Sequence, residues 1–159
     1  MASTLTLRQR LNQLGGDPPD QIPFLVWLLE NPDSRFALPG CIDLHGHDCL
    51  HVLLQRGFSP YDEAFVLGFS MGNDVRTKGI HVLLLKLASQ LLYPAKYRFV
   101  PDHFISFDLG YRYGKGVAIR DLNKLDYRSF YELPVGRLQQ KLGIDPMALR
   151  LLKCVERLG

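Results

Sequence analysis

The sequence has few cysteines, no long run of one charge sign and no apolar stretch long enough to cross a bilayer. Its three cysteines, Cys41, Cys49 and Cys154, include no Cys-x-x-Cys pair, so neither a disulfide framework nor a cysteine zinc ribbon is predicted. This usage fits a reducing compartment. The most apolar stretch, residues 80–92, spans thirteen residues and contains Lys86 and Gln90, whereas a membrane span needs ~20 apolar residues. We therefore expect no transmembrane helix.

The charge balance is nearly even. The chain has 19 basic and 16 acidic residues, a formal net charge of +3, and no run of five or more like charges. This balance argues against nucleic acid as a partner, although a basic face could still meet an anionic membrane or a phosphate. The N-terminal residues lack the long apolar region of a secretory signal. We expect a protein that is soluble or peripherally membrane-associated on the cytoplasmic side.

Helical periodicity runs through almost the whole chain, and strand-like alternation is hard to find. The 159 residues, with 47% hydrophobic content, are enough for one domain with a sizeable core. The sequence therefore predicts an all-α, compact single-domain bundle of about seven or eight helices over residues 1–159. Apolar spacing and end signals place the helices at residues 5–14, 22–29, 42–56, 60–71, 77–92, 101–119, 138–142 and 146–158.

Three helix ends have specific signals. Asp20 and Ser59 are predicted N-caps, and Ser59 is followed by Pro60 at the first helical position. Gly57 is expected to end the helix over residues 42–56, because glycine readily adopts the left-handed conformation that follows many helices.

Residues 45–63, HGHDCLHVLLQRGFSPYDE, concentrate metal-binding side chains. His47 and His51 are four residues apart, so in a helix they project from one face. Asp48 lies ~100° round the helix from His47. An antiparallel hairpin around residues 57–59 would bring Glu63 level with His51. His47, Asp48, His51 and Glu63 are therefore predicted to bind a divalent ion, with zinc the leading candidate and iron(II), manganese or magnesium as alternatives.

This predicted ligand set favours a catalytic ion, because three or four small ligands leave coordination positions open. The alternative is that the histidines are hydrogen-bonded core or boundary residues and the carboxylates are ordinary surface acids. His45 is expected on the other side of the helix, facing solvent or supporting the site. Asp43, one turn before His47, could orient the second ring nitrogen of that histidine.

The site motif resembles that of a known family. His47-Asp48-Cys49-Leu50-His51, eleven intervening residues and Glu63 are similar to the His-Asp-x-x-His…Glu pattern of the ubiquinone (coenzyme Q) biosynthesis protein family numbered four. Residues 107–116, FDLGYRYGKG, and residues 133–144 resemble later segments of that family. The resemblance covers about residues 20–145, and the helical tail at 146–158 lies outside it.

The resemblance implies an all-helical protein that binds a divalent ion through His47, Asp48, His51 and Glu63. It implies an isoprenoid lipid or prenylated quinone precursor as ligand. A membrane surface, other quinone-biosynthesis proteins and further copies of the chain are the implied partners. The implied activity is oxidative decarboxylation of a prenylated aromatic acid. The alternative is a non-catalytic lipid-binding scaffold or carrier that organises a quinone-biosynthesis complex.

The residues themselves suggest how such chemistry would work. A prenyl chain needs an apolar groove, and the aromatic and methionine side chains near the ion, Phe65, Phe69 and Met71, are the best candidates to line it. The ion would act as a Lewis acid, and Asp48 or Glu63 would accept a proton if it were not a ligand. Two other hypotheses are an interaction module without metal and a His-Asp phosphohydrolase. The absence of a histidine before His45 disfavours the phosphohydrolase.

Overall fold

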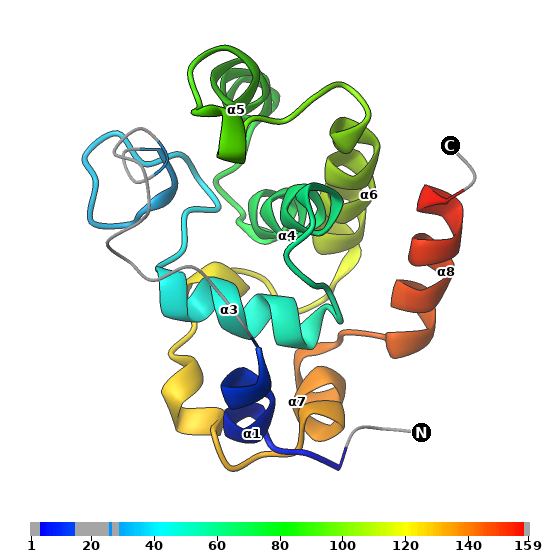
Figure 1. Ribbon diagram of the computed structural model, residues 1–159. Helices are drawn as coiled ribbons and strands as arrows, with labels where there is room; N and C mark the ends of the chain where they lie inside the picture. Colours follow the sequence, from blue (N-terminus) through cyan, green and yellow to red (C-terminus); the bar gives the residue numbers. More distant parts are fainter. Residues whose placement is uncertain (1–3, 15–25, 27–28, 158–159) are drawn as a thin grey trace.

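The computed structural model describes residues 4–14, 26 and 29–157. Over these residues the chain forms seven α-helices and no sheet, which confirms the all-α prediction (Figure 1). The second predicted helix, at residues 22–29, and its cap Asp20 fall mainly outside the described residues. The helices are α1 Leu7–Gln13, α3 Leu44–Leu53, α4 Pro60–Asn73, α5 Gly79–Leu91, α6 His103–Gly116, α7 Val135–Leu142 and α8 Pro146–Glu156. Short 3-10 turns lie at Ala95–Tyr97, Leu122–Lys124 and Tyr127–Phe130.

Polar caps set where the two site-bearing helices begin. As predicted, Ser59 caps α4: its Oγ accepts a hydrogen bond from the Asp62 backbone N–H at 3.2 Å, and Pro60 is the first helical residue. Helix α3 begins at Leu44 because Asp43 is its N-cap, with the carboxylate accepting from the Gly46 N–H at 2.6 Å. Such caps satisfy backbone donors that have no partner inside the helix.

The end of α3 differs from the prediction. The left-handed residue is Gln55, with φ of 55°, and Gly57 has an ordinary φ. The Arg56 N–H donates to the His51 carbonyl at 2.9 Å and the Gln55 N–H donates to the Val52 carbonyl at 3.2 Å. These two bonds form a Schellman motif, which satisfies the last carbonyls of the helix. Helix α3 therefore stops at Leu53, before the predicted glycine.

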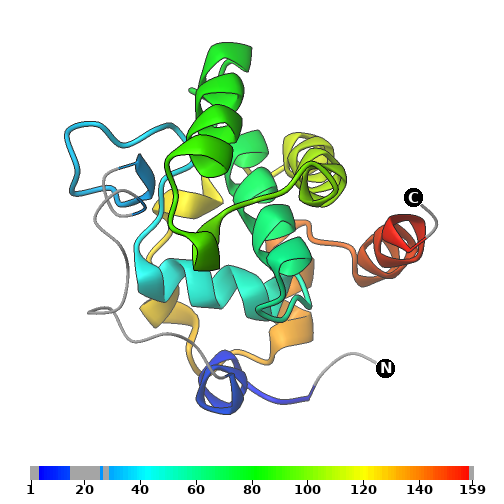
Figure 2. The same ribbon diagram turned by 45° about the horizontal axis from the view of Figure 1, so that its top comes forward.

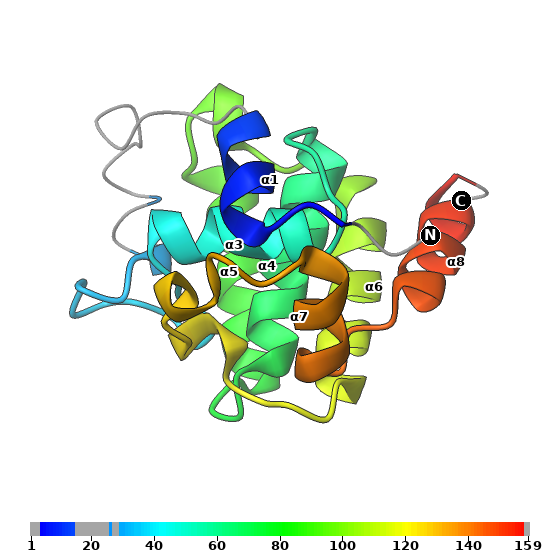
Figure 3. The same cartoon turned by 90° about the horizontal axis from the view of Figure 1, so that it is seen from below.

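Helices α4 and α6 pack together through glycines. Each helix has two glycines four residues apart, Gly68 and Gly72 on α4 and Gly110 and Gly114 on α6. A Cβ at any of the four would collide with a backbone carbonyl of the other helix. Gly68 meets residue 107 and Gly72 meets residue 111, so the two helices run in the same direction, side by side (Figure 3).

Side chains also tie together the C-terminal ends of these two helices. The Arg120 guanidinium donates to the carbonyls of Gly72, Gly114 and Lys115 at 2.8, 3.1 and 2.6 Å. Asn73 donates to the Gly114 carbonyl at 3.1 Å and accepts from the Leu122 N–H at 2.8 Å. Terminal helix carbonyls carry partial negative charge, so a guanidinium in this position is favourable.

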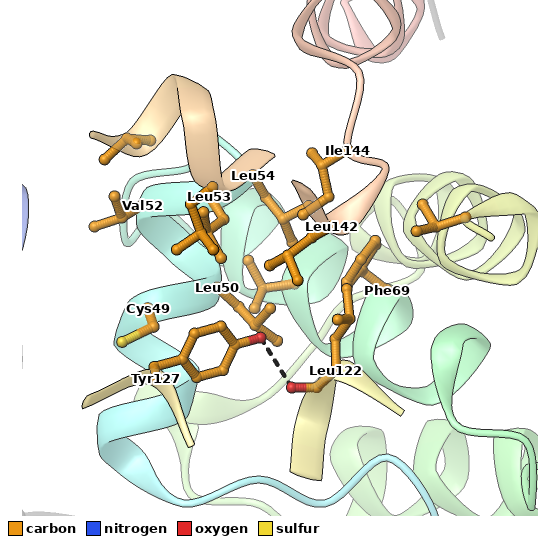
Figure 4. Close-up of a cluster of buried hydrophobic side chains, with 14 of the residues drawn as sticks. Cys49, Leu50, Val52, Leu53, Leu54, Phe69, Leu122, Tyr127, Leu142 and Ile144 are labelled. Carbon is orange, nitrogen blue, oxygen red and sulfur yellow. Dashed lines mark hydrogen bonds between the residues drawn. The ribbon is translucent and has the colours of Figure 1, made fainter. Parts of the chain in front are cut away.

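The main core lies between α3, α4, α7 and the segment that contains the 3-10 turns at residues 122–130 (Figure 4). Tyr127 is buried there, and its hydroxyl donates to the Leu122 carbonyl at 2.8 Å. A second cluster joins α4, α5 and α6 through Ala64, Leu67, Met71, Leu85, Phe99 and Phe107. Among the described residues, no helix combines the length and the apolar character that a membrane span requires.

Candidate metal centre

The predicted ligands meet where α4 crosses α3. His47 and His51 lie one turn apart on α3, and Glu63 lies in the first turn of α4. Figures 1 and 2 show α4 crossing α3 steeply, so the antiparallel hairpin expected from the sequence is not formed. Glu63 still reaches both imidazoles because the start of α4 lies close to the crossing. The structure therefore brings together three of the four predicted ligands.

The spacing of the donor atoms fits a small tetrahedral ion. Glu63 Oε2 lies 3.4 Å from His47 Nε2 and 3.5 Å from His51 Nε2, and the three atoms are all within 4.8 Å of one another. In a tetrahedral zinc site with bonds of ~2.0–2.1 Å, neighbouring ligand atoms are ~3.3–3.4 Å apart. Octahedral coordination with bonds of ~2.1 Å would bring neighbouring ligands to ~3.0 Å. The distances of 3.4 and 3.5 Å from Glu63 Oε2 match the tetrahedral case better.

His51 is fully buried, and its surroundings favour a bound ligand atom. Among the described residues Nδ1 has no hydrogen-bond partner, and Nε2 has only the Glu63 carboxylate, at the long distance of 3.5 Å. Buried polar atoms are normally well paired, and an ion on Nε2 would replace this long contact with a coordination bond. The ring is held between those of His47 and Phe58, at centroid distances of 4.5 and 4.7 Å.

The electrostatics favour the protonation states that bind a cation. Burial lowers the pKa of His47 to about 4, and repulsion from His51 adds to this effect while Glu63 opposes it. Burial alone would raise the pKa of Glu63, but its contacts with His51 and His47 outweigh burial and hold that pKa below its usual value. At neutral pH His47 is therefore neutral and Glu63 is ionised, which are the forms that coordinate metals.

The remaining predicted residues lie around this centre. Asp48 is outside the three-residue cluster but faces the same cavity, and burial raises its pKa. His45 points to the other side of α3, where its Nε2 lies 3.2 Å from the Tyr131 hydroxyl. The Asp43 carboxylate caps α3 by accepting from Gly46, and no hydrogen bond between its carboxylate and the ring of His47 is found among the described residues.

A cavity of about 510 Å³ lies beside the metal centre. His47, Asp48 and Glu63 line one part of it, whereas the fully buried His51 is not among its lining residues. Most of the other lining residues are apolar: Val26, Leu29, Leu38, Pro39, Ile42, Leu44, Phe58, Leu67, Met71, Leu85 and Phe99. The cavity thus joins a cluster of donor groups to an apolar chamber, the usual composition of a small-molecule site.

Of the three residues predicted to contact a substrate, only Met71 lines this cavity. Met71 lines the cavity as expected, but the fully buried Phe65 and Phe69 belong to the main core and neither lines this cavity. The α4 residues that line the cavity are Pro60, Glu63, Leu67, Ser70 and Met71, which share one helix face. Phe65 lies on a different face, with the Arg56 guanidinium 3.6 Å from its ring centroid.

A second polar site, which the sequence did not predict, lies in the cavity wall. The Tyr93 hydroxyl donates to Glu30 Oε1 at 2.6 Å, and both residues line the cavity. Burial raises the pKa of Glu30 to about 7, although the hydrogen bond from Tyr93 opposes that rise. The two residues are 63 positions apart, so no local pattern could have paired them.

Comparisons of the chain with protein-family models, with curated proteins and with solved structures found no match. The geometry of the cluster and the cavity, together with the motif in residues 47–63, is therefore the basis for assigning a function.

Proposed function

We propose that the protein binds a divalent ion, zinc foremost, and holds a prenylated aromatic acid in the adjoining cavity. The proposal depends on one observation: a carboxylate oxygen 3.4 and 3.5 Å from two imidazole nitrogens, with all three atoms within 4.8 Å of one another, stands beside a largely apolar cavity of about 510 Å³. An ion held by three protein groups keeps a coordination position for substrate or water. His47 and Glu63 line the cavity, so that position would be reachable from it.

The shape and chemistry of the cavity support a ligand with one polar end. Small-molecule pockets are typically ~300–1,000 Å³ and mainly apolar, with a few polar groups that orient the ligand. The apolar wall would hold the isoprenoid tail, and the ring with its carboxyl and hydroxyl groups would face His47, Asp48 and Glu63. The motif resemblance to quinone-biosynthesis proteins favours a quinone precursor as this ligand.

The residues of the chain have distinct roles in this proposal. His47, His51 and Glu63 would hold the ion, which when bound would act as a Lewis acid toward a ring oxygen or carboxylate. Asp48 faces the same cavity and has a raised pKa, so it would accept or return a proton at the ring. The apolar wall would exclude water from the ring. The activity proposed is oxidative removal of the ring carboxyl group: it leaves as carbon dioxide, water supplies the hydroxyl that replaces it, and dioxygen takes up the two electrons and becomes hydrogen peroxide.

The test is elemental analysis of the purified protein together with mass spectrometry of its lipid extract. We expect about one zinc per chain and a co-purifying prenylated aromatic compound. His47→Ala should lose the zinc. His45→Ala is the matched control because His45 lies on the same helix outside the cluster, and it should keep the zinc. A wild-type protein without metal and without lipid would overturn the proposal.

A second measurement separates an enzyme from a carrier. The zinc-loaded protein is incubated with a prenylated hydroxybenzoic acid and dioxygen, and release of carbon dioxide is followed. The catalytic role is supported if carbon dioxide is released and if Asp48→Asn reduces that release while zinc stays bound. Tight retention of the acid without any release supports the alternative, a non-catalytic carrier or scaffold.

A further inference from the structure

Helix α5 turns its apolar side chains outward. All its exposed residues are glycine or aliphatic: Gly79, Ile80, Leu83, Leu84, Leu87 and Leu91. The five aliphatic side chains are 45–70% exposed, and Leu92, directly after the helix, is 59% exposed. A surface helix normally buries its apolar stripe and exposes its polar one, so this face marks an interaction surface.

The inward side of α5 is already occupied. Leu85, Ala88 and Ser89 are its buried residues, and Leu85 packs in the cluster between α4, α5 and α6. Figures 1 and 2 place α5 at one end of the molecule, away from α1 and α7. The outward leucines therefore have no place in the core, and a partner approaching from that end would meet them first.

The sequence segment around α5 is rich in basic residues, of which Arg76 and Lys86 pair with Asp74 and Asp108 at 3.1 and 2.6 Å. Residues 75–112 contain six basic side chains (Arg76, Lys78, Lys86, Lys96, Arg98 and Arg112) and two acidic ones (Asp102 and Asp108). The rest of the chain has the remaining 13 basic and 14 acidic residues, so the net positive charge of the protein comes from this segment. Lys78 is the N-cap of α5, and Lys96 and Arg98 follow the helix, so cations stand near both of its ends.

We propose that the outward face of α5 docks on an anionic membrane surface. An interfacial helix inserts aliphatic side chains at the headgroup boundary, and nearby cations add attraction to anionic lipid. A second copy of the chain fits less well, because a two-fold pairing of the α5 faces would bring two positively charged segments together. The occupant is therefore lipid with negatively charged headgroups.

Docking on this face would connect the membrane to the cavity. Leu85 on the inner side of α5, and Tyr93, Arg98 and Phe99 just beyond it, line the cavity. A membrane docked on this face would therefore lie next to a segment that also lines the proposed site. This last step rests on the proposed function, whereas the docking itself does not.

The test is flotation of the metal-free protein with phosphatidylcholine vesicles that contain or lack phosphatidylglycerol. We expect binding to the anionic vesicles, weaker binding to the neutral ones, and release as salt is added. The double variant Leu83→Glu and Leu87→Glu should bind the anionic vesicles at least about tenfold less well. Both side chains are exposed, so the variant should keep its fold, which circular dichroism checks.

A matched control comes from α8. Met147 and Leu151 have the same four-residue spacing and are 59% and 62% exposed, so Met147→Glu with Leu151→Glu should leave vesicle binding unchanged. Equal loss in both double variants, or no vesicle binding by the wild type, would overturn the docking surface. The proposal would also be overturned if the wild type were a dimer and the α5 double variant a monomer, because a second copy of the chain would then cover the face of α5. A protein that binds vesicles but no zinc would instead overturn the metal centre alone.

Discussion

Gln55 holds a backbone conformation that suits glycine better than glutamine. Its φ is 55°, in the left-handed region where a Cβ is crowded. Gln55→Gly should therefore raise the free energy of unfolding by roughly 0.5–1 kcal/mol, as measured by urea denaturation. Gln140→Gly in the interior of α7 is the matched control, and it should lower stability by a similar amount because glycine weakens a regular helix. Destabilisation by both changes would contradict this account.

The ionisation of Glu30, in the cavity wall, should make the stability of the fold depend on pH. Its pKa is raised from 4.5 to about 7, so the folded protein holds this proton more tightly than the unfolded chain does. The protonated Glu30 side chain therefore contributes stability that is fully present below pH 4.5 and is lost as pH rises through 7. Glu30→Gln should therefore gain ~1–3 kcal/mol relative to wild type across that window. Urea denaturation in the presence of a chelator, at several pH values, measures the difference.

The variant Tyr93→Phe tests whether Glu30 is the group that titrates. The hydrogen bond from Tyr93 lowers the pKa of Glu30, so its removal should move the pKa upward and shift the window to higher pH. If Glu30→Gln and wild type lose stability in parallel across this window, Glu30 is not the titrating group.

At the scale of the helices, the glycine contact between α4 and α6 should tolerate no side chain. At Gly110 a Cβ would collide with the Phe65 backbone carbonyl, and backbone cannot rotate out of the way. Gly110→Ala should lower the free energy of unfolding by ~2 kcal/mol or more. Gly116, at the end of the same helix, faces open space, so Gly116→Ala should be neutral or stabilising by up to ~1 kcal/mol. Equal effects in thermal unfolding would show that the contact is looser than described.

This helix pair also shows what the sequence could and could not predict. The four-residue spacing of glycines on both helices is visible in the sequence, but nothing local says that the two helices touch or that they run parallel. Phe65 and Phe69 show the same limit. Periodicity places them on one face of α4, yet only the packed structure shows that this face meets the core and not the cavity.

The proximity of three of the four candidate ligands could be predicted because it is mostly local. His47 and His51 share a face of α3 through their four-residue spacing, and Glu63 lies just after the short connection to α4. The three residues meet although the predicted hairpin is not formed, because Glu63 lies in the first turn of α4, next to the point where the helices cross. Glu30 and Tyr93 meet through tertiary packing alone, so the sequence carried no comparable signal.

At the scale of the whole molecule, metal binding should raise the stability of the fold. An ion that binds only the folded state adds ~2.7 kcal/mol at a free concentration of about 100 times Kd. For a domain of this size each kcal/mol corresponds to ~2–4 °C, so saturating zinc should raise Tm by roughly 5–10 °C and a chelator should reverse the rise. His47→Ala should show almost no rise, and His45→Ala, outside the cluster, should show the full rise from its own baseline. A zinc-dependent rise of equal size in both variants would place the ion elsewhere, since the cluster at the start of α4 would not be its site.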